Sequence, residues 1–564
     1  MATKKLDVES VGEAYLALLK ARGIDYVFAN GGTDFAPVVE GLARAQAKGI
    51  PMPETIPIAH ENCAIGMAHG YYIATGRPQA VMVHVTVGTA NAICNLMNAT
   101  RENVPIFFCA GRTPIHEDGV LGARSNVIHW AQEMFDQAGM LRELVKWDYE
   151  LRDGLQLQTV VDRALSISMS EPKGPIYLSL PREVLAGKMD GLVVNDRVAA
   201  AEPTAPNPAG IERAAEILAQ AQNPLIITAA SGVDQETVPL LAKMAERFAL
   251  PVVEFRSRYV CLPSNHPMHL GGEVDPYIVD ADAILVLDTD VPWLPFFKEP
   301  KKGCKLIQIG PDPLFSRIPI RSFNAEVAIA STVRNALGPL TAALWKAMAD
   351  KGDAIERRRK KIAAEREKHH ARIAGVRHNG KITKAWLSKC VSDSKTADTI
   401  VVNEYPLFRG LMSFTKPGTW FGAGPAGGLG WGLPAALGVQ LAKPDATVIS
   451  ACGDGSYMFA NPVACHQVSE ALKLPVLTVV CNNRRWNAVR MAALEVYPDG
   501  AASRANRMPI TSLEPSPRFE KVVEASGGYG ERVEEPDELP AALERAMKVV
   551  KKEKRQALLN VITE

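Results

Sequence analysis

Residues 453–483 read GDGSYMFANPVACHQVSEALKLPVLTVVCNN, and this stretch decides the fold. A strand expected over 447–452 ends in the GDG motif, and a second strand expected over 476–481 ends in the NN motif. The 26 residues between the motifs, 456–481, have the length of one βαβ crossover. Both strand ends should therefore emerge at the same edge of a parallel sheet.

Polar groups suited to a metal and a phosphate gather at this predicted edge, where ligands of open parallel sheets bind. Asp454 and Asn483 carry the oxygens that Mg²⁺ prefers, together with substrate phosphates. Gly453 and Gly455 would let the backbone approach a diphosphate, and Ser456 at the helix start can donate to phosphate oxygen. A GDG motif alone is equally typical of a simple turn. The matching NN motif favours the binding site.

The same pattern of apolar strand, glycine-containing turn and helix recurs along the chain. Strands that alternate with helices indicate βαβ units, and continuously apolar strands indicate burial on both faces of a sheet. We therefore predict an α/β fold with three doubly wound parallel-sheet domains. The other strand segments are YVFANGG (26–32), AVMVHVTVGTAN (80–91), PIFFCAG (105–111), PLIITAASG (224–232), AILVLDTD (283–290) and KLIQIGPD (305–312).

Two linkers divide the chain. Residues 195–210 are rich in Ala and Pro and predict an extended connector, and residues 346–379 predict a charged helix. The resulting domains are an N-terminal domain over 1–190, a central α/β domain over 205–345 and a C-terminal domain over 380–564.

The predicted charged helix belongs to a chain with almost no net charge. It should be a solvated link with i,i+4 pairs such as Glu356–Lys360. Its basic run is interspersed with Glu, and the whole chain carries 63 basic and 62 acidic residues, a net charge of +1. This balance argues against nucleic acid and against an anionic membrane as a partner.

Cysteine usage and apolar patterning predict a cytoplasmic protein. The nine cysteines show no CxxC pair and no zinc spacing, which indicates a reducing compartment. The first 23 residues predict an amphipathic helix rather than a signal peptide, and no apolar run is long enough to span a membrane.

The GDG and NN motifs together resemble the signature of thiamine-diphosphate (ThDP) enzymes. The resemblance implies that Asp454, the Asn483 side chain and the Arg485 carbonyl bind Mg²⁺. Upstream, GPAGGLGWG (424–432) resembles the segment that holds the cofactor's aminopyrimidine. There, the Gly427 carbonyl would accept a hydrogen bond from the 4′-amino group, and Leu429 would force the bent conformer. Without the downstream motifs, Leu429 would be a core residue and the glycines would serve helix packing.

The segment 58–111 also resembles this family through its HE..A..MA.GY...TG pattern. Glu61 would be the carboxyl that contacts N1′ of the aminopyrimidine, and we expect it in an apolar pocket with a raised pKa. HVTVGTAN, which begins at His84, resembles HSAAGTGN of benzoylformate decarboxylase-like enzymes, and the 23-residue step from Glu61 is preserved. His84 would then be a proton shuttle, placed near the end of a strand over 80–87. The alternative is a core histidine bonded to backbone.

Thr33, in NGGTDF (30–35), occupies the position of a substrate-binding serine in that subgroup. Its hydroxyl would hold the donor's carboxylate or carbonyl. The alternative is a helix N-cap, which suits Thr33 and Asp34 equally well.

The central region departs from several relatives. The loop over 288–300 lacks the second histidine of benzoylformate decarboxylases, and its Trp293, Phe296 and Phe297 suggest an apolar wall. The His-His pair of pyruvate decarboxylases is absent near 111–116. We see no Arg-containing flavin loop and therefore do not expect flavin. Residues 403–406, NEYP, lack the Thr-Ser pair that relatives place on the diphosphate.

The resemblance implies a ThDP- and Mg²⁺-dependent lyase or transferase that decarboxylates or ligates a 2-keto acid or a related small carbonyl compound. An acetolactate-synthase-like enzyme is the nearest alternative. A flavin- or NAD-dependent oxidoreductase is disfavoured because no convincing GxGxxG opens a helix after a strand with an acidic residue about twenty positions on. An inactive paralogue would be expected to lose Glu61 or the metal ligands, which this chain retains. The family also implies a homodimer or homotetramer with its sites at the dimer interface.

Overall fold

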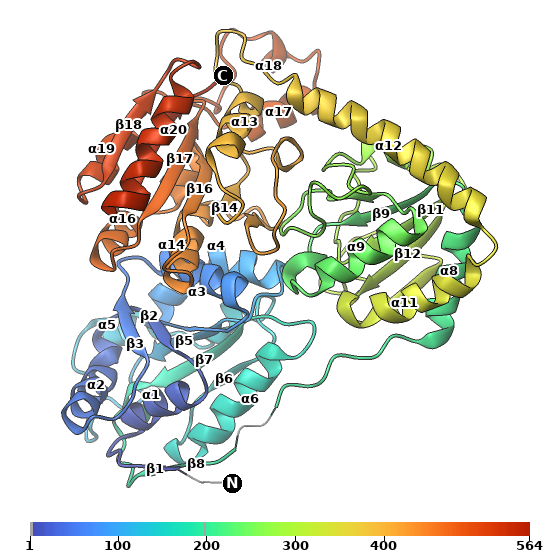
Figure 1. Cartoon of the computed structure of the whole chain (residues 1–564). Helices are drawn as coiled ribbons and strands as arrows, with labels where there is room; N and C mark the ends of the chain where they lie inside the picture. The colour runs from blue at the N-terminus through green and yellow to red at the C-terminus, as the bar shows by residue number, and fades with distance from the viewer. Residues whose placement is uncertain (1–3, 197–198) are drawn as a thin grey trace.

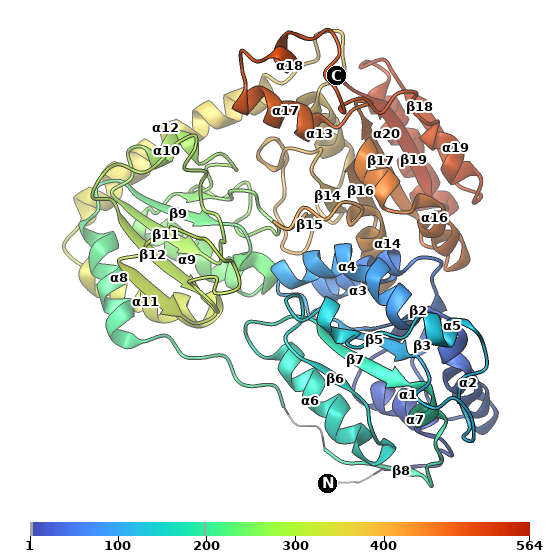
Figure 2. The ribbon, with the colours of Figure 1, turned by 180° about the vertical axis from the view of Figure 1, so that it is seen from behind.

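The computed structural model describes residues 4–196 and 199–564, which form three parallel-sheet domains (Figure 1). The N-terminal and C-terminal domains lie against each other, and the central domain stands beside them, as the reverse view also shows (Figure 2). Each sheet carries helices on both faces, so the predicted fold class is confirmed. No helix among the described residues is both long and apolar enough to cross a bilayer.

The N-terminal domain contains a six-stranded parallel sheet of order β3-β2-β4-β5-β7-β6. A short antiparallel pair, β1 with β8, joins the start of the chain to residues 192–194. The strands are β1 Lys4–Leu6, β2 Tyr26–Asn30, β3 Glu54–Pro57, β4 Ala80–Val83, β5 Phe107–Arg112, β6 Asp148–Glu150, β7 Ile176–Pro181 and β8 Leu192–Val194, and the main helices are α1 Val11–Ala21, α2 Ala36–Lys48, α3 Glu61–Thr75, α4 Val85–Arg101 and α6 Leu157–Met169.

The C-terminal domain repeats this topology with the order β15-β14-β16-β17-β19-β18. Numbered within each domain, both sheets read 2-1-3-4-6-5. The strands are β14 Ile400–Glu404, β15 Trp420–Gly422, β16 Val448–Gly453, β17 Val476–Asn482, β18 Tyr529–Val533 and β19 Ala557–Ile562, and the main helices are α13 Lys384–Ser394, α14 Gly432–Ala442, α15 Asp454–Phe459, α16 Pro462–Ala471 and α20 Leu539–Lys548.

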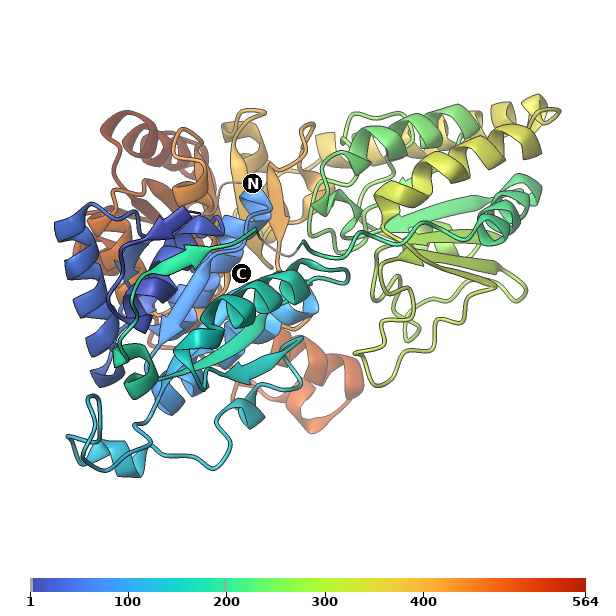
Figure 3. The ribbon, with the colours of Figure 1, turned by 90° about the horizontal axis from the view of Figure 1, so that it is seen from below.

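The central domain has a five-stranded parallel sheet of order β10-β9-β11-β12-β13 and its own hydrophobic core. Viewed from below, it stands to the side of the paired outer domains and meets the C-terminal domain along one edge (Figure 3). Its elements are β9 Pro224–Thr228, β10 Val252–Val253, β11 Ala283–Leu287, β12 Lys305–Gly310, β13 Val327–Ala330, α8 Pro208–Gln220, α9 Thr237–Phe248, α10 Asp275–Ile278 and α11 Val333–Ala347.

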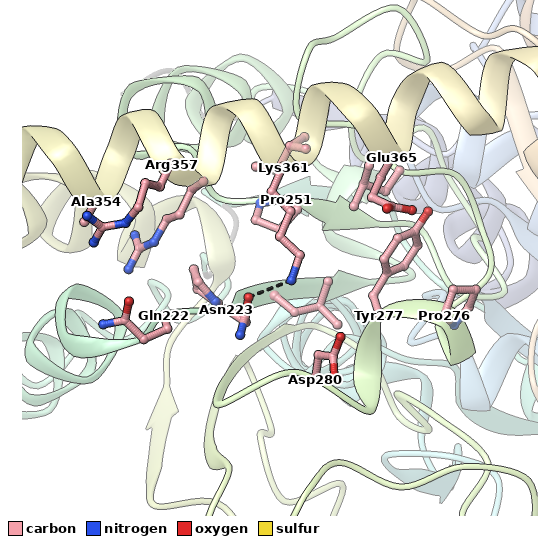
Figure 4. Close-up of a pocket in the computed structure, with 15 residues that line it drawn as sticks. Gln222, Asn223, Pro251, Pro276, Tyr277, Asp280, Ala354, Arg357, Lys361 and Glu365 are labelled. Atoms are coloured by element: carbon pink, nitrogen blue, oxygen red, sulfur yellow. Dashed lines mark hydrogen bonds between the residues drawn. The ribbon is translucent and has the colours of Figure 1, made fainter.

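The predicted linker helix is α12, Gly352–Ala374, and it is docked rather than fully solvated. Arg358 and Ile362 are buried, and Arg358 donates to the Leu218 carbonyl at the end of α8. A cavity of about 330 Å³ lies between α12 and the start of β9 (Figure 4). The predicted Glu356–Lys360 pair does not form, because Glu356 instead pairs with Arg359 at 3.3 Å.

Helices α3 and α14 join the two outer domains at very short range. A Cβ on Gly70 would lie 1.9 Å from the Ala435 carbonyl oxygen, and one on Gly438 would lie 2.0 Å from that of Met67. Only glycine permits this approach. One hydrophobic core accordingly runs from Phe28 in the N-terminal domain to Leu558 in the C-terminal domain.

The prediction of a strand over 80–87 is wrong beyond Val83. β4 ends at Val83, and α4 begins at Val85, whose φ of 31° marks a sharp turn. The alternation of valines that predicted a longer strand therefore continues into a helix. His84 occupies the junction between the two elements.

Candidate functional site

The N-terminal part of the site lies where the strand order reverses, between β2 and β4. Ligands of open α/β sheets bind at this switch point, outside the carboxyl ends of the strands. Thr33 and Asp34 follow β2 directly, and His84 follows β4. The fold therefore brings together two of the predicted catalytic residues, Thr33 and His84, from sequence positions about 50 residues apart.

His84 is bonded to a carboxylate rather than to backbone. Its Nδ1 donates to Oδ1 of Asp34 at 2.5 Å, and the Asp34 carboxylate is almost fully buried. The hydrogen bond that His84 donates to Asp34 raises the pKa of His84, although burial lowers it. The alternative of a backbone-bonded core histidine is thus wrong, and so is the alternative of Asp34 as a helix N-cap.

Two glycines make room for this pair. A Cβ on Gly32 would lie 2.1 Å from Nδ1 of His84, and a Cβ on Gly111 would lie 1.7 Å from Oδ2 of Asp34. Any side chain at either position would displace the pair. The site thus depends on the backbones of both loops as well as on its polar side chains.

Thr33 contacts a second histidine that the sequence did not reveal. Its Oγ1 lies 3.1 Å from Nε2 of His129, in α5 (Ile128–Ala131). Because Nδ1 of His129 accepts from the Ser125 backbone at 3.1 Å, neutral His129 carries its proton on Nε2 and donates to Thr33. Burial and the nearby Arg182 lower the pKa of His129. The N-cap alternative for Thr33 is wrong, because Gly32 caps this turn.

Glu61 opens α3 and is largely buried. Its Oε2 accepts from Nδ2 of Asn91 at 3.2 Å and lies 3.9 Å from Nδ1 of His60, so its surroundings are more polar than the expected apolar pocket. Its Oε1 lies within 3.2 Å of the Cβ position of Gly88, one turn of α4 beyond His84. Glu61 and His84 therefore face the same region of the domain.

The C-terminal part of the site gathers at the ends of β16 and β17. Asp454 begins α15, and one of its oxygens, Oδ1, accepts from the Gly455 backbone at 3.0 Å. The Arg484 and Arg485 backbone amides also face this carboxylate, while burial raises its pKa. The expected crossover thus places the GDG and NN motifs at one edge of the sheet. The helix was expected to start at Ser456, but α15 begins two residues earlier, at Asp454.

These residues fit a divalent cation. Oδ2 of Asp454 is buried and has no hydrogen-bond partner among the described residues, so a carboxylate oxygen is left for a metal. Oδ1 of Asn483 accepts from the Arg485 amide at 3.0 Å, and the Arg485 carbonyl accepts from Asn487 at 2.9 Å. Each of these oxygens retains a second lone pair. A Cβ on Gly455 would lie 2.2 Å from Trp486, which explains that glycine.

A carboxylate missed in the sequence organises the neighbouring loop. Glu404 ends β14, at the switch point of the C-terminal sheet, and is buried. Its oxygens accept from the Gly430 amide at 2.8 Å and the Gly432 amide at 2.6 Å. The Ser456 hydroxyl also faces this carboxylate. Burial raises the pKa of Glu404 to about 7, and these donors oppose the shift.

Replacing Glu404 by alanine should loosen this loop. Two buried backbone amides would lose their acceptor, and each unsatisfied donor costs about 1–3 kcal/mol. We expect the free energy of unfolding to fall by at least about 2 kcal/mol in urea titrations. Glu404→Gln is the control, since it keeps one acceptor and should lose less. Equal losses in the two variants would contradict this role.

The loop over 427–430 is held by α4 of the same chain. Asn98 donates to the Gly428 carbonyl at 2.8 Å and accepts from its amide at 3.1 Å, and the Cys94 thiol faces the Leu429 carbonyl at 3.7 Å. Gly427 has a φ of 70°, a conformation that favours glycine. The loop is thus a fixed feature between the outer domains.

The structure forms two clusters, one on each outer sheet. In residues 4–196 and 199–564, no hydrogen bond or ion pair joins the first cluster to the second. The first cluster is Thr33, Glu61 and His84, and the second is Asp454, Asn483 and Arg485.

The expected apolar wall in the central domain is only partly present. Trp293 is buried and packs against Phe323 in the central core, so it cannot line a wall. Phe296 and Phe297 are exposed and pack on each other. Their neighbour Leu294 lines a cavity of about 940 Å³ between the central and C-terminal domains.

Comparison with known families covers most of the chain. Residues 9–140 match the thiamine pyrophosphate enzyme N-terminal TPP binding domain, residues 211–340 match the central domain, and residues 405–561 match the C-terminal TPP binding domain.

Characterised relatives are similar over nearly their full length. The acetolactate synthase isozyme 3 large subunit of Escherichia coli is 25% identical, covering 88% of this chain and 85% of its own. The benzoylformate decarboxylase of Pseudomonas aeruginosa is also 25% identical, covering 87% and 89%. A probable 2-ketoarginine decarboxylase of the same species is 27% identical, covering 88% and 86%.

A solved structure shares the fold. The ThDP-dependent 4-hydroxybenzoylformate decarboxylase of Rhodococcus jostii superposes with a TM-score of 0.78 at 23% identity, covering 98% of this chain and 99% of its own.

Proposed function

Because the chain belongs to the thiamine pyrophosphate enzymes, we propose that it breaks or forms the C–C bond next to the carbonyl of a 2-keto acid, with ThDP and Mg²⁺ bound. The observation that carries this proposal is the Asp34–His84–Thr33 cluster at the switch point of the pyrimidine-binding domain. When bound, ThDP supplies a carbon nucleophile and stores the electrons of the cleaved bond. Relatives that are named decarboxylases support this reaction class.

The protein's own residues divide the remaining tasks. Asp454, Asn483 and the Arg485 carbonyl would hold the metal, while Gly427 and Leu429 would hold the aminopyrimidine. Glu61 would hold a proton at N1′ of that ring. Thr33, whose Oγ1 accepts a hydrogen bond from Nε2–H of His129, would donate a hydrogen bond from its own hydroxyl to the substrate's carboxylate or carbonyl. His84 would move a proton at the reacting carbon through Nε2, the ring nitrogen opposite Asp34.

A panel of 2-keto acids, offered with and without aldehyde acceptors, tests the proposal. Release of CO₂ that depends on ThDP and Mg²⁺ would support it. Product analysis then separates decarboxylation from carboligation. Failure on every donor, with ThDP bound, would refute it.

An acetolactate-synthase-like reaction is the second candidate, favoured by the Escherichia coli relative. In that reaction a second keto acid accepts the donor fragment. Incubation with pyruvate alone distinguishes the two: formation of acetolactate would favour the synthase, and formation of acetaldehyde would favour the decarboxylase.

We also propose that two copies assemble so that the N-terminal cluster of one chain meets the C-terminal cluster of the other. The separation of the clusters within one chain supports this assembly. A dimer or tetramer in light scattering would agree with it, and an active monomer would contradict it.

All nine cysteines are free thiols, which supports a cytoplasmic location.

His84→Ala should bind ThDP normally and exchange the cofactor's C2 proton at the normal rate, but turn over about 10²–10⁴ times more slowly. The reason is that His84 would act only after the cofactor is activated. The melting temperature with cofactor checks that ThDP still binds, and single-turnover rates measure the slower turnover.

His466→Ala is the matched control, because His466 is buried and bonded to Tyr457 and Gln556 within the C-terminal core. This control should melt early and turn over normally. If His84→Ala behaved in the same way, the catalytic assignment would fail.

A further inference from the structure

We propose that Asp34 is the positioning residue of this site: it fixes His84 with Nδ1–H toward the carboxylate, so that Nε2 is the atom that gives and takes the proton. This inference rests on the proposed function for its catalytic meaning. The contact itself does not, because it joins two side chains of the free protein.

The geometry of the pair leaves one arrangement for the ring. Nδ1 lies 2.5 Å from Oδ1 of Asp34, a distance at which a carboxylate requires an N–H donor. Gly32 packs closely against the ring, and Gly111 packs closely against the carboxylate, at distances that leave no room for a side chain on either glycine. Rotating the ring to exchange its nitrogens would break a charge-assisted bond inside a buried pocket. Nε2 is therefore the nitrogen available to substrate.

The same contact also influences the pKa of His84. A carboxylate beside an imidazole favours the imidazolium, and the pKa of His84 is raised accordingly. The other ionisable groups near the pair come from separate elements. Glu61 faces His84 from α3, His129 faces both residues from α5 beside Arg182 and Arg124, and the Cys109 thiol of β5 faces Asp34.

The pKa values of the two histidines are shifted in opposite directions. Asp34 favours the charged form of His84, whereas burial and Arg182 favour the neutral form of His129. One site thus combines a histidine suited to giving a proton with one suited to donating a hydrogen bond. In each cycle His84 would give the Nε2 proton to the reacting carbon or oxygen and regain one from water, with Nδ1–H bonded to Asp34 throughout.

Asp34→Asn tests this role in the protein loaded with ThDP and Mg²⁺. Diethylpyrocarbonate modifies neutral imidazole, so its rate at the His84 peptide, followed by mass spectrometry across pH, gives the titration midpoint. We expect the titration midpoint of wild-type His84 to lie above 6.5, and we expect this midpoint to fall by about 1 pH unit in the Asn variant. The pH at which turnover declines on the alkaline side should fall with it. Asp34→Glu should restore part of both.

Asp162→Asn is the control, because Asp162 is equally buried in the same domain but pairs with Arg22 at 2.6 Å. It should destabilise the protein without moving either midpoint. An unchanged His84 midpoint in Asp34→Asn, or a wild-type midpoint at or below 6.5, would overturn the proposal. If Asp34→Asn does not fold, Asp34→Glu and the wild-type midpoint still decide it. A wild type inactive on every keto acid would refute the proposed function, while the modification rates would still report on Asp34.

Discussion

Replacing Asp454 by alanine should weaken the retention of ThDP and Mg²⁺ by more than about 100-fold. The reason is that the diphosphate would be held largely through the metal, and Asp454 offers the buried, unpartnered carboxylate oxygen that a cation requires. Titration calorimetry with ThDP and Mg²⁺ measures the loss. Affinity equal to that of the wild type would mean that the GDG motif is only a turn.

The same substitution should change the stability of the cofactor-free protein little. Burial raises the pKa of Asp454, so the empty site holds this charge at a cost. The Gly455 amide would lose its acceptor, which opposes the gain by about 1–3 kcal/mol. The free energy of unfolding without cofactor should therefore change by less than about 2 kcal/mol in Asp454→Ala. Asp454→Asn keeps an oxygen but not the charge. Its affinity for ThDP and Mg²⁺ should therefore lie between that of the wild type and that of Asp454→Ala. A large loss of stability in the cofactor-free variant would show a structural role instead.

Glu61→Gln should slow exchange of the cofactor's C2 proton by about 10²–10⁴-fold while leaving ThDP and metal affinity nearly intact. An amide in place of the carboxyl cannot share a proton with N1′. Proton–deuterium exchange of the bound cofactor measures the effect directly. The Asn91 contact at 3.2 Å can be kept by the glutamine oxygen, so the fold should tolerate the change.

Glu13→Gln is the matched control for Glu61. Glu13 is fully buried in the same domain, but it lies on α1, where it accepts from the Glu9 backbone and packs against Gly41 of α2. The exchange rate in this variant should equal that of the wild type. Normal exchange in Glu61→Gln would remove this residue from the proposed mechanism.

The fold was largely predictable because its strands are short, apolar and bounded by glycine. The segments that became β2, β9, β16 and β17 begin and end within a few residues of the expected positions. The failure at β4 has a local cause. Thr86 and Val87 have strand propensity, but the chain turns at Val85 to enter the switch point, and tertiary position overrides propensity there.

The candidate site was only partly predictable, for a different reason. Thr33, Glu61 and His84 could be proposed from sequence because they stand in segments that resemble those of the family. Asp34 stood beside Thr33 at a strand end, where its position was a usable signal, but a local cap explained it equally well. His129 carried no signal at all, since it lies in the single-turn helix α5, outside any recognised motif, and meets Thr33 only through the tertiary fold.

The core shared by the outer domains limits which parts of the chain recombination can exchange. Residues from Phe28 to Leu558 pack in one cluster that joins the two outer domains, and Ala230 and Tyr259 of the central domain also belong to it. The central domain packs mainly around its own cluster, from Ile211 to Ile362. Recombination that exchanges the central domain and keeps apolar residues at positions 230 and 259 leaves the shared core in place, whereas exchange of either outer domain replaces a large part of it. The central domain is thus the part of this chain that evolution, or a protein engineer, can substitute as a module.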